Sequence, residues 1–365
     1  MANVKSRPLC LFRIDICRRV AILSVLYLLF IVCGEIQSAQ KHVETDFSPE
    51  IQYFAERTIN ETVGSFHAAG GWALVQEVRT GRILAMASST NGQYSTVNTV
   101  FEPGTLFKPF ILAAALNEQL VTPCATTNSG ANNFRYGNMT LQCHVPKEVT
   151  SSIKYTLALA SSEVFHKIGL MLGDKLIEEY CRRFNFGAKL NGGLPSECEG
   201  FIAVDKDRNK RIASRISIGY GVGVTALQMI NAYSCIANDG MLMRPSFGQC
   251  PMPEILGRPV TQEVARTMKD LLRITEDVQG KEMFESLHGL PAAGQAGMAQ
   301  KKNDGYYSAS EYYVAFAGFV PVDNPVFCVF VIVDAPKPLR TGGIVAFPAF
   351  AKISIATARI LSVSK

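Results

Sequence analysis

The sequence has little of what metal, redox and nucleic-acid chemistry requires. Its five histidines are scattered along the chain, and it contains neither a Cys-x-x-Cys pair nor a His-Glu-x-x-His run. We therefore expect no metal site and no cofactor. The formal net charge is only +5, and much of it lies in the N-terminal tail, so nothing predicts a nucleic-acid partner.

Long apolar runs are also scarce. The longest notable one, from Val20 to Gly34, follows a tail in which five basic residues accompany the single acid Asp15. A basic flank before an apolar run predicts an N-terminus held in the cytoplasm. We therefore predict a basic cytoplasmic tail at 1–19, a signal anchor or transmembrane segment at 20–39, and an extracytoplasmic domain at 40–365.

Cleavage of that segment stays open at this point. About fifteen apolar residues are few for a spanning helix and enough for the core of a signal peptide. Ser38 and Ala39 could end a cleavage site, but Gln37 is a poor residue three positions before a cut after Ala39.

Ten cysteines in a chain bound for an oxidising compartment make disulfides possible. Cys124 and Cys143 bracket the turn-rich loop 128–133, which a bridge between them could fix, although sequence alone does not determine the pairing. Cys181, Cys235 and Cys328 lie in apolar surroundings and are expected to be buried thiols.

The segment from Phe101 to Phe110 places a hydroxyl and an amine three residues apart. A Pro-Gly turn before Thr105 and the apolar run 110–116 predict a helix that begins with Thr105 as its N-cap. Thr105 and Lys108 would then share one helix face. A buried lysine beside a hydroxyl is one way to activate a nucleophile, whereas a capping threonine and a solvated lysine are the simpler alternative.

This segment resembles the active-site segment of penicillin-binding protein transpeptidases, where a Ser-x-x-Lys motif supplies nucleophile and base. The resemblance continues in the family's order from about residue 46 to the C-terminus. The further matching segments are 81–88, 157–164 at the place of the Ser-x-Asn motif, 217–228 and 232–240 around Gly-Tyr-Gly and Ala-Asn-Gly-Gly, 294–300 at the place of Lys-Thr-Gly-Thr-Ala, and 316–321.

The sequence departs from the family pattern at the positions that carry the chemistry. Thr105 stands where the family has serine, and Glu163 stands where it has asparagine. In the third motif, Gln295, Ala296 and Met298 replace Lys, Thr and the later Thr, while Lys108, Ser161 and Gly297 are retained.

The resemblance implies a mechanism in which Lys108 takes the nucleophile's proton and Ser161 relays it to the leaving group. A carboxylate at Glu163 close to Lys108 would favour the protonated amine, which is the wrong form for a base. The third-motif changes remove the cation and the hydroxyl that meet a ligand carboxylate, and the extra methyl of Thr105 crowds the attack. An active alternative would need Lys301 or Lys302 to supply the lost cation beside Gly297.

Local patterns predict an α+β fold. A helix is expected from about Pro49 to Val63, a hairpin from strands 72–77 and 83–86, and helices at 153–172 and 175–184. Residues 187–200 are expected to form a loop, strands 312–319 and 326–333 a second hairpin, and residues from Pro348 to Leu361 a closing helix. The resemblance implies an antiparallel five-stranded sheet flanked by helices, with a helical subdomain.

The resemblance also implies a function. We expect a penicillin-binding-protein-like protein of bacterial peptidoglycan (cell wall) synthesis, anchored in the inner membrane by a single segment with its domain in the periplasm, and catalytically impaired so that it acts as a scaffold or regulator. The alternatives are an active D,D-transpeptidase or carboxypeptidase that uses Thr105, and a non-catalytic domain that binds peptidoglycan fragments.

The expected partners follow from the same resemblance. They are other membrane proteins of cell-wall synthesis, in division or elongation, and a weakly bound peptidoglycan precursor or peptide stem. Only about a dozen residues separate Ala39 from the first expected helix. The pedestal domain of the family is therefore expected to be absent, and the domain is expected to lie close to the membrane.

Overall fold

The computed structural model describes residues 46–89, 96–128, 133–136, 139–142, 150–194, 197–203, 212–248, 252–303, 305–339 and 341–363. All of these belong to one compact unit that begins at Thr45. None of the helices within these ranges is both long and apolar enough to span a bilayer. The predicted anchor at 20–39 lies outside the described residues.

A five-stranded antiparallel sheet, in the order β11-β12-β13-β1-β2, forms the centre of the unit. Its strands are β1 (Gly70–Glu77), β2 (Ile83–Ser88), β11 (Ala293–Asn303), β12 (Tyr306–Val320) and β13 (Phe327–Asp334). The N-terminal hairpin pairs with the C-terminal one, since Trp72 of β1 lies opposite Ile332 of β13. This is the predicted α+β architecture.

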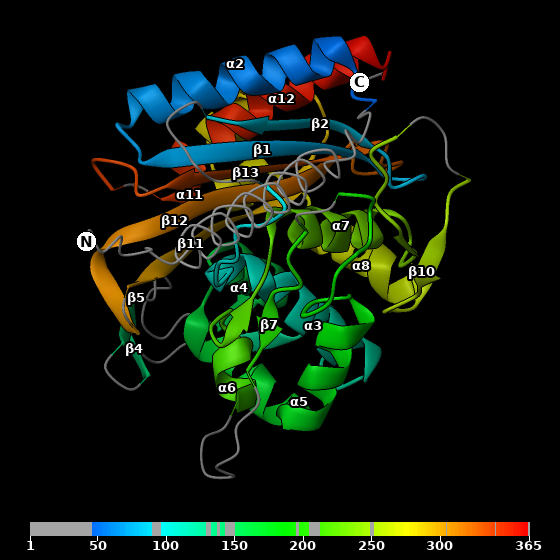
Figure 1. Cartoon of the computed structure of the whole chain (residues 1–365). Coiled ribbons are helices and arrows are strands. Elements are labelled where there is room, and N and C mark those ends of the chain that lie inside the picture. The colour runs from blue at the N-terminus through cyan, green and yellow to red at the C-terminus, as the bar shows by residue number, and fades with distance from the viewer. Residues whose placement is uncertain are drawn as a thin grey trace, which may run out of the picture. The chain divides into compact units, whose positions relative to one another are not determined.

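Helices cover both faces of the sheet (Figure 1). On one face, α2 (Pro49–Ser65) and α12 (Phe347–Ile360) lie side by side, and α11 (Gly342–Val345) lies at the end of that layer. On the other face lie α3 (Lys108–Asn117), α4 (Ile153–Ala158), α5 (Ser162–Arg183), α6 (Ile212–Ile216), α7 (Ala226–Ala237) and α8 (Gln262–Leu272). Two short helices, α9 (Glu276–Gln279) and α10 (Lys281–Glu285), precede β11.

Short elements complete the chain. They are the 3-10 helix η1 (Gly104–Phe107) and the two-stranded pairs β3 (Thr126–Asn128) with β6 (Thr150–Ser152), β4 (Asn133–Tyr136) with β5 (Met139–Gln142), β7 (Phe201–Ile202) with β8 (Val222–Gly223), and β9 (Leu242–Met243) with β10 (Ile255–Gly257).

The strand alternation divides the core in two. Leu74 and Phe330 face the helical side, whereas Ala73 and Val329 face α2 and α12. Successive side chains of a strand point to opposite faces, so a sheet covered on both sides must be apolar throughout. All eight residues of β13 except Asp334 are apolar and every one is buried, which places this strand at the centre of the fold.

Helix α7 is wholly buried between the sheet and the other helices. Its start is fixed by a capping box, in which Thr225 Oγ1 accepts from the Gln228 amide and Gln228 Oε1 accepts from the Thr225 amide. Its Tyr233 hydroxyl donates to the Leu106 carbonyl of η1 at 3.1 Å, and burial raises the Tyr233 pKa well above its usual value. The central helix therefore supports η1 from behind.

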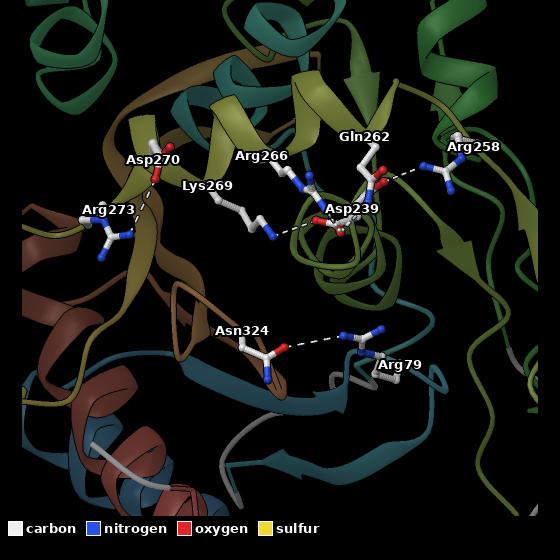
Figure 2. Close-up of polar contacts among 9 residues, drawn as sticks. All are labelled: Arg79, Asp239, Arg258, Gln262, Arg266, Lys269, Asp270, Arg273 and Asn324. Carbon is white, nitrogen blue, oxygen red and sulfur yellow. Dashed lines mark hydrogen bonds and ion pairs between the residues drawn. The ribbon is translucent and has the colours of Figure 1, made fainter.

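A polar cluster holds the turn after α7 against α8 (Figure 2). Lys269 Nζ lies 2.7 Å from Asp239 Oδ1, and Gln262 donates to Asp239 Oδ2 at 2.9 Å. Burial alone would raise the Asp239 pKa, but these donors and Arg266 outweigh it and lower the pKa to about 2. The carboxylate is thus a structural element of this turn.

Candidate active site

Thr105 and Lys108 lie at the junction of η1 and α3. The prediction that Thr105 caps the helix was wrong, because α3 begins at Lys108 and its N-cap position is Phe107. The Thr105 carbonyl accepts from the Lys108 amide, so Thr105 is already inside a 3-10 turn and not flanking one. In a 3-10 helix residues i and i+3 eclipse, and the two side chains therefore still share a face.

Close backbone packing fixes η1 between two other segments. The Gly104 amide donates to the Gly219 carbonyl at 3.0 Å, and a Cβ on Gly219, whose φ is +80°, would lie 1.9 Å from the Gly104 oxygen. On the other side, a Cβ on Gly297 of β11 would lie 2.4 Å from Leu106 Cγ. Only glycine allows these approaches, so the three family-like segments meet at η1.

The Lys108 amine is buried beside the start of α5. The residue is 1% exposed, and its Nζ lies 2.5 Å from the Ala160 carbonyl oxygen and 3.0 Å from Ser162 Oγ. It also lies 5.7 Å from the centre of the Phe165 ring. These two hydrogen bonds link Lys108 to the junction of α4 and α5.

Ser161, the predicted proton relay, occupies the N-cap position of α5 and is completely buried. Its Oγ has no hydrogen-bond partner in the described part of the chain, and it does not cap the helix. Its neighbour Ser162 contacts Lys108 instead. Sequence reasoning missed Ser162, although its position as the first residue of a helix next to Ser161 was a usable signal.

Glu163 lies in the first turn of α5, and its Oε1 is 2.8 Å from Lys167 Nζ. This is a pairing between residues i and i+4 on one helix face. The predicted effect of Glu163 on the Lys108 amine stays a prediction.

Strand β11 contains Gln295, Ala296, Gly297 and Met298, the residues predicted to stand at the third motif. Gln295 is 4% exposed, and its Nε2 donates to the neighbouring Ala296 carbonyl at 3.1 Å. Ala296 and Met298 pack against the core on the α2 and α12 side.

The two lysines considered as substitute cations are engaged elsewhere. Lys301 Nζ lies 2.6 Å from Asp334 Oδ1, a fully buried carboxylate at the end of β13, and 5.1 Å from the Tyr313 ring. Lys302 Nζ lies 5.7 Å from the centre of the Tyr307 ring. The alternative in which one of these amines supplies a cation beside Gly297 stays a prediction.

A further polar group missed by the sequence analysis is Glu102, three residues before Thr105. Its Oε1 accepts from the Gly221 amide at 2.8 Å. Burial, and to a smaller extent the Glu102 carboxylate, raises the pKa of the nearby Tyr307 to about 12. Glu102 thus ties the η1 segment to the Gly-Tyr-Gly segment.

The predicted cysteine pairing lies partly outside the described residues. Cys124 is an exposed free thiol, and its proposed partner Cys143 is not among the described residues. Burial raises the pKa of the Cys181 thiol to about 12 and also raises those of Cys235 and Cys328. The described residues contain no group of three or more His, Cys, Asp or Glu that could hold a metal ion.

Comparison with known proteins agrees with this geometry. Residues 71–354 match the family described as the penicillin binding protein transpeptidase domain. The chain is 27% identical over 344 residues to the probable peptidoglycan D,D-transpeptidase PbpC of Pseudomonas aeruginosa, covering 89% of this chain and 60% of that protein. It is 27% identical over 329 residues to the probable peptidoglycan D,D-transpeptidase PenA of Neisseria flavescens, covering 86% and 81%.

Among solved structures, the transpeptidase domain of Burkholderia pseudomallei penicillin-binding protein 3 superposes with a TM-score of 0.77 at 26% identity, covering 88% of this chain and 98% of that one. This chain belongs to the penicillin binding protein transpeptidase domain family. It is related to peptidoglycan D,D-transpeptidases, and it spans about 60% of the length of PbpC.

Proposed function

We propose that this protein is a membrane-anchored, penicillin-binding-protein-like component of peptidoglycan synthesis whose transpeptidase site is catalytically impaired. It acts as a scaffold or regulator for other membrane proteins of cell-wall synthesis, with its domain on the periplasmic side of the inner membrane. The family membership and the relatives' names support the link to peptidoglycan. The basic tail and apolar run at the N-terminus support the anchor.

The observation that carries the proposed impairment is the chemistry of β11. A ligand carboxylate needs a cation and hydroxyl donors with correct geometry. Here Gln295 uses its amide on the adjacent backbone. Ala296 and Met298 carry apolar side chains that pack against the core on the α2 and α12 side of the sheet. Catalytic groups that act as a unit lose most of their rate enhancement when several are removed.

The nucleophile side of the site supports the same conclusion. Thr105 carries a β-branched methyl that restricts χ1. The Lys108 amine donates to the Ala160 carbonyl and to Ser162 Oγ. A productive nucleophile and its base are expected within about 2.6–3.2 Å of each other.

The experiment is intact-mass analysis of the full chain in detergent after incubation with a fluorescent penicillin, with Thr105→Ala as the control. We expect no adduct on protein that is shown to be folded by circular dichroism. A stoichiometric adduct that disappears in Thr105→Ala would overturn the proposed impairment and establish Thr105 as a live nucleophile.

A further inference from the structure

We propose that the outer edge of strand β2 is a concealed docking surface for the β2 edge of a second copy of this chain, and that residues 46–52 close it in the monomer. We call these residues the N-terminal strap. The sheet order makes β11 and β2 the two edge strands, and η1 contacts β11, so the β2 edge lies across the sheet from the candidate active site (Figure 1). The surface therefore stands or falls independently of the proposed function.

The Gln52 side chain closes the middle of this edge. Gln52 Oε1 accepts from the Met86 amide at 2.8 Å, and Gln52 Nε2 donates to the Met86 carbonyl at 3.0 Å. The same Nε2 also donates to Glu56 Oε1 at 2.7 Å, which fixes the orientation of the amide. In an antiparallel sheet, a residue of a neighbouring strand would make the same pair of hydrogen bonds to Met86. Gln52 therefore occupies the place of a strand residue.

The backbone of the strap closes the start of the same edge. The Ser48 amide donates to the Leu84 carbonyl at 2.9 Å, two residues before Met86 on β2. The strap is itself fixed by the Asp46 amide, which donates to the Phe247 carbonyl at 2.8 Å, and by the Phe47 ring, whose centre lies 6.5 Å from that of Phe247. The outward groups of β2 at these positions are thus satisfied within one copy of the chain.

The two edges of the sheet differ in how their sequences resist pairing with another strand. Edge strands commonly carry lysine, which hinders pairing with a second sheet, and β11 contains Lys301 and Lys302. Strand β2 consists only of Ile, Leu, Ala, Met and Ser, so it has neither a charge nor a proline. An uncovered apolar edge of this kind is a template for pairing. Protection of β2 therefore depends on the strap.

The uncharged sequence of β2 also identifies the occupant. Two copies of one strand bring identical charges together, and like charges directly opposite each other are destabilising. Strand β2 has no charge, so two copies can pair antiparallel without this repulsion. In such a pair Met86 of each copy exchanges both backbone hydrogen bonds with Met86 of the other, which gives a closed dimer with two-fold symmetry.

The test uses the full chain in detergent and the variant Ser48→Pro/Gln52→Ala. Gln52→Ala removes both bonds to Met86, and Ser48→Pro removes the amide that bonds to Leu84. Proline suits position 48, because Ser48 has a φ of −68° and makes no side-chain cap bond. Sedimentation velocity measures the mass, and hydrogen exchange with mass spectrometry measures the protection of the Met86 amide.

The expected result depends on protein concentration. At about 2 µM the variant should have the wild-type mass, and its Met86 amide should exchange at least about tenfold faster than in the wild type, because the bond to Gln52 is lost. At about 100 µM its mass should double relative to the wild type. Exchange at Met86 should then slow towards the wild-type rate, because the second β2 strand accepts the hydrogen bond of this amide.

Arg57→Ala is the matched control, since Arg57 is another polar residue of α2, 58% exposed, whose side chain pairs with Glu61 of the same helix. It should keep the wild-type mass and exchange at both concentrations. A folded double variant that keeps the wild-type mass at the higher concentration would overturn the docking surface. A dimer in which the Met86 amide stays unprotected would also overturn it, because that dimer would form elsewhere. If circular dichroism shows that the double variant does not fold, Gln52→Ala alone is judged by the same two measurements.

Discussion

The backbone contacts around η1 and the side chains proposed to carry the chemistry differ in how they compare with the family pattern. Glycines let η1 approach the Gly-Tyr-Gly segment and β11 closely, and these backbone contacts are present. The proposed losses are side chains, at Thr105, Glu163, Gln295, Ala296 and Met298. On this proposal, the backbone contacts around the site depend on packing and not on the catalytic groups.

The largest expected effect comes from disrupting the close backbone contact between Gly104 and Gly219. Gly219→Ala should destabilise the fold by at least about 3 kcal/mol, because the new methyl carbon would lie 1.9 Å from the Gly104 oxygen at a φ of +80°. Urea unfolding at neutral pH measures this change.

The matched control for that substitution is Gly289→Ala. Gly289 has nearly the same φ, +79°, but no atom lies within 4 Å of the added Cβ. It should cost only the backbone strain, about 1 kcal/mol. Equal losses in the two variants would show that the close approach at η1 contributes nothing.

The second prediction concerns a variant that carries the family's residues at the five substituted positions and keeps the glycines around η1 unchanged. A variant that combines Thr105→Ser, Glu163→Asn, Gln295→Lys, Ala296→Thr and Met298→Thr should react with penicillin at least about 100-fold faster than the wild type, since preorganised donors and a base act together. Intact-mass kinetics measure the rate. A folded variant that stays unlabelled would mean that the backbone of η1 and β11 holds the five restored side chains in the wrong positions.

The smallest effect is expected at Asp239, whose carboxylate holds the turn after α7 against α8. The folded-state pKa of about 2 lies below the ordinary 3.8, so the carboxylate stabilises the fold above pH 3.8 and loses this contribution as the pH falls towards 2. Asp239→Asn should therefore cost about 1–2 kcal/mol at pH 7, after allowance for partial exposure, and much less at pH 2.

Urea unfolding of the wild type and Asp239→Asn at both pH values tests this, with Asp270→Asn as the control. Asp270 is 75% exposed in its ion pair with Arg273, and its loss should change stability by less than about 0.5 kcal/mol. The same loss for Asp239→Asn at pH 7 and at pH 2 would contradict the assigned role of the carboxylate.

Much of the fold was predictable because its strongest signals are local. The periodicity of residues 49–63 predicted α2, and the apolar runs near the C-terminus predicted β12 and β13 within a few residues. The prediction of one helix from Ile153 to Leu172 was wrong, because the chain breaks between α4 and α5 where Ala160 adopts a positive φ. The predicted break between a helix ending at Leu172 and one beginning at Lys175 is confirmed, because Gly173 adopts non-helical angles within α5, with φ 74° and ψ 167°. The positive φ at Ala160 was not predictable from residue type, since alanine rarely adopts it.

The sequence predicted the members of the candidate site but not their contacts. Motif spacing named Thr105, Lys108 and Ser161 as its residues, and their catalytic roles stay predictions. The contact between Lys108 and the Ala160 carbonyl involves a backbone atom, and any sequence can supply one. The pair between Lys301 and Asp334 joins residues on different strands, so its formation depends on a register that only the folded sheet defines.

The pairing of β1 with β13 has a consequence for the time course of folding. Gly70 lies opposite Asp334, so the middle of the sheet joins the first and last strands of the chain. Contacts of such high sequence separation form slowly, because a large loop must close before they contribute. During synthesis, β1 has only β2 as a neighbouring strand until β13, which ends at Asp334, has emerged. The five-stranded sheet, and with it the contact between η1 and β11, is therefore completed late.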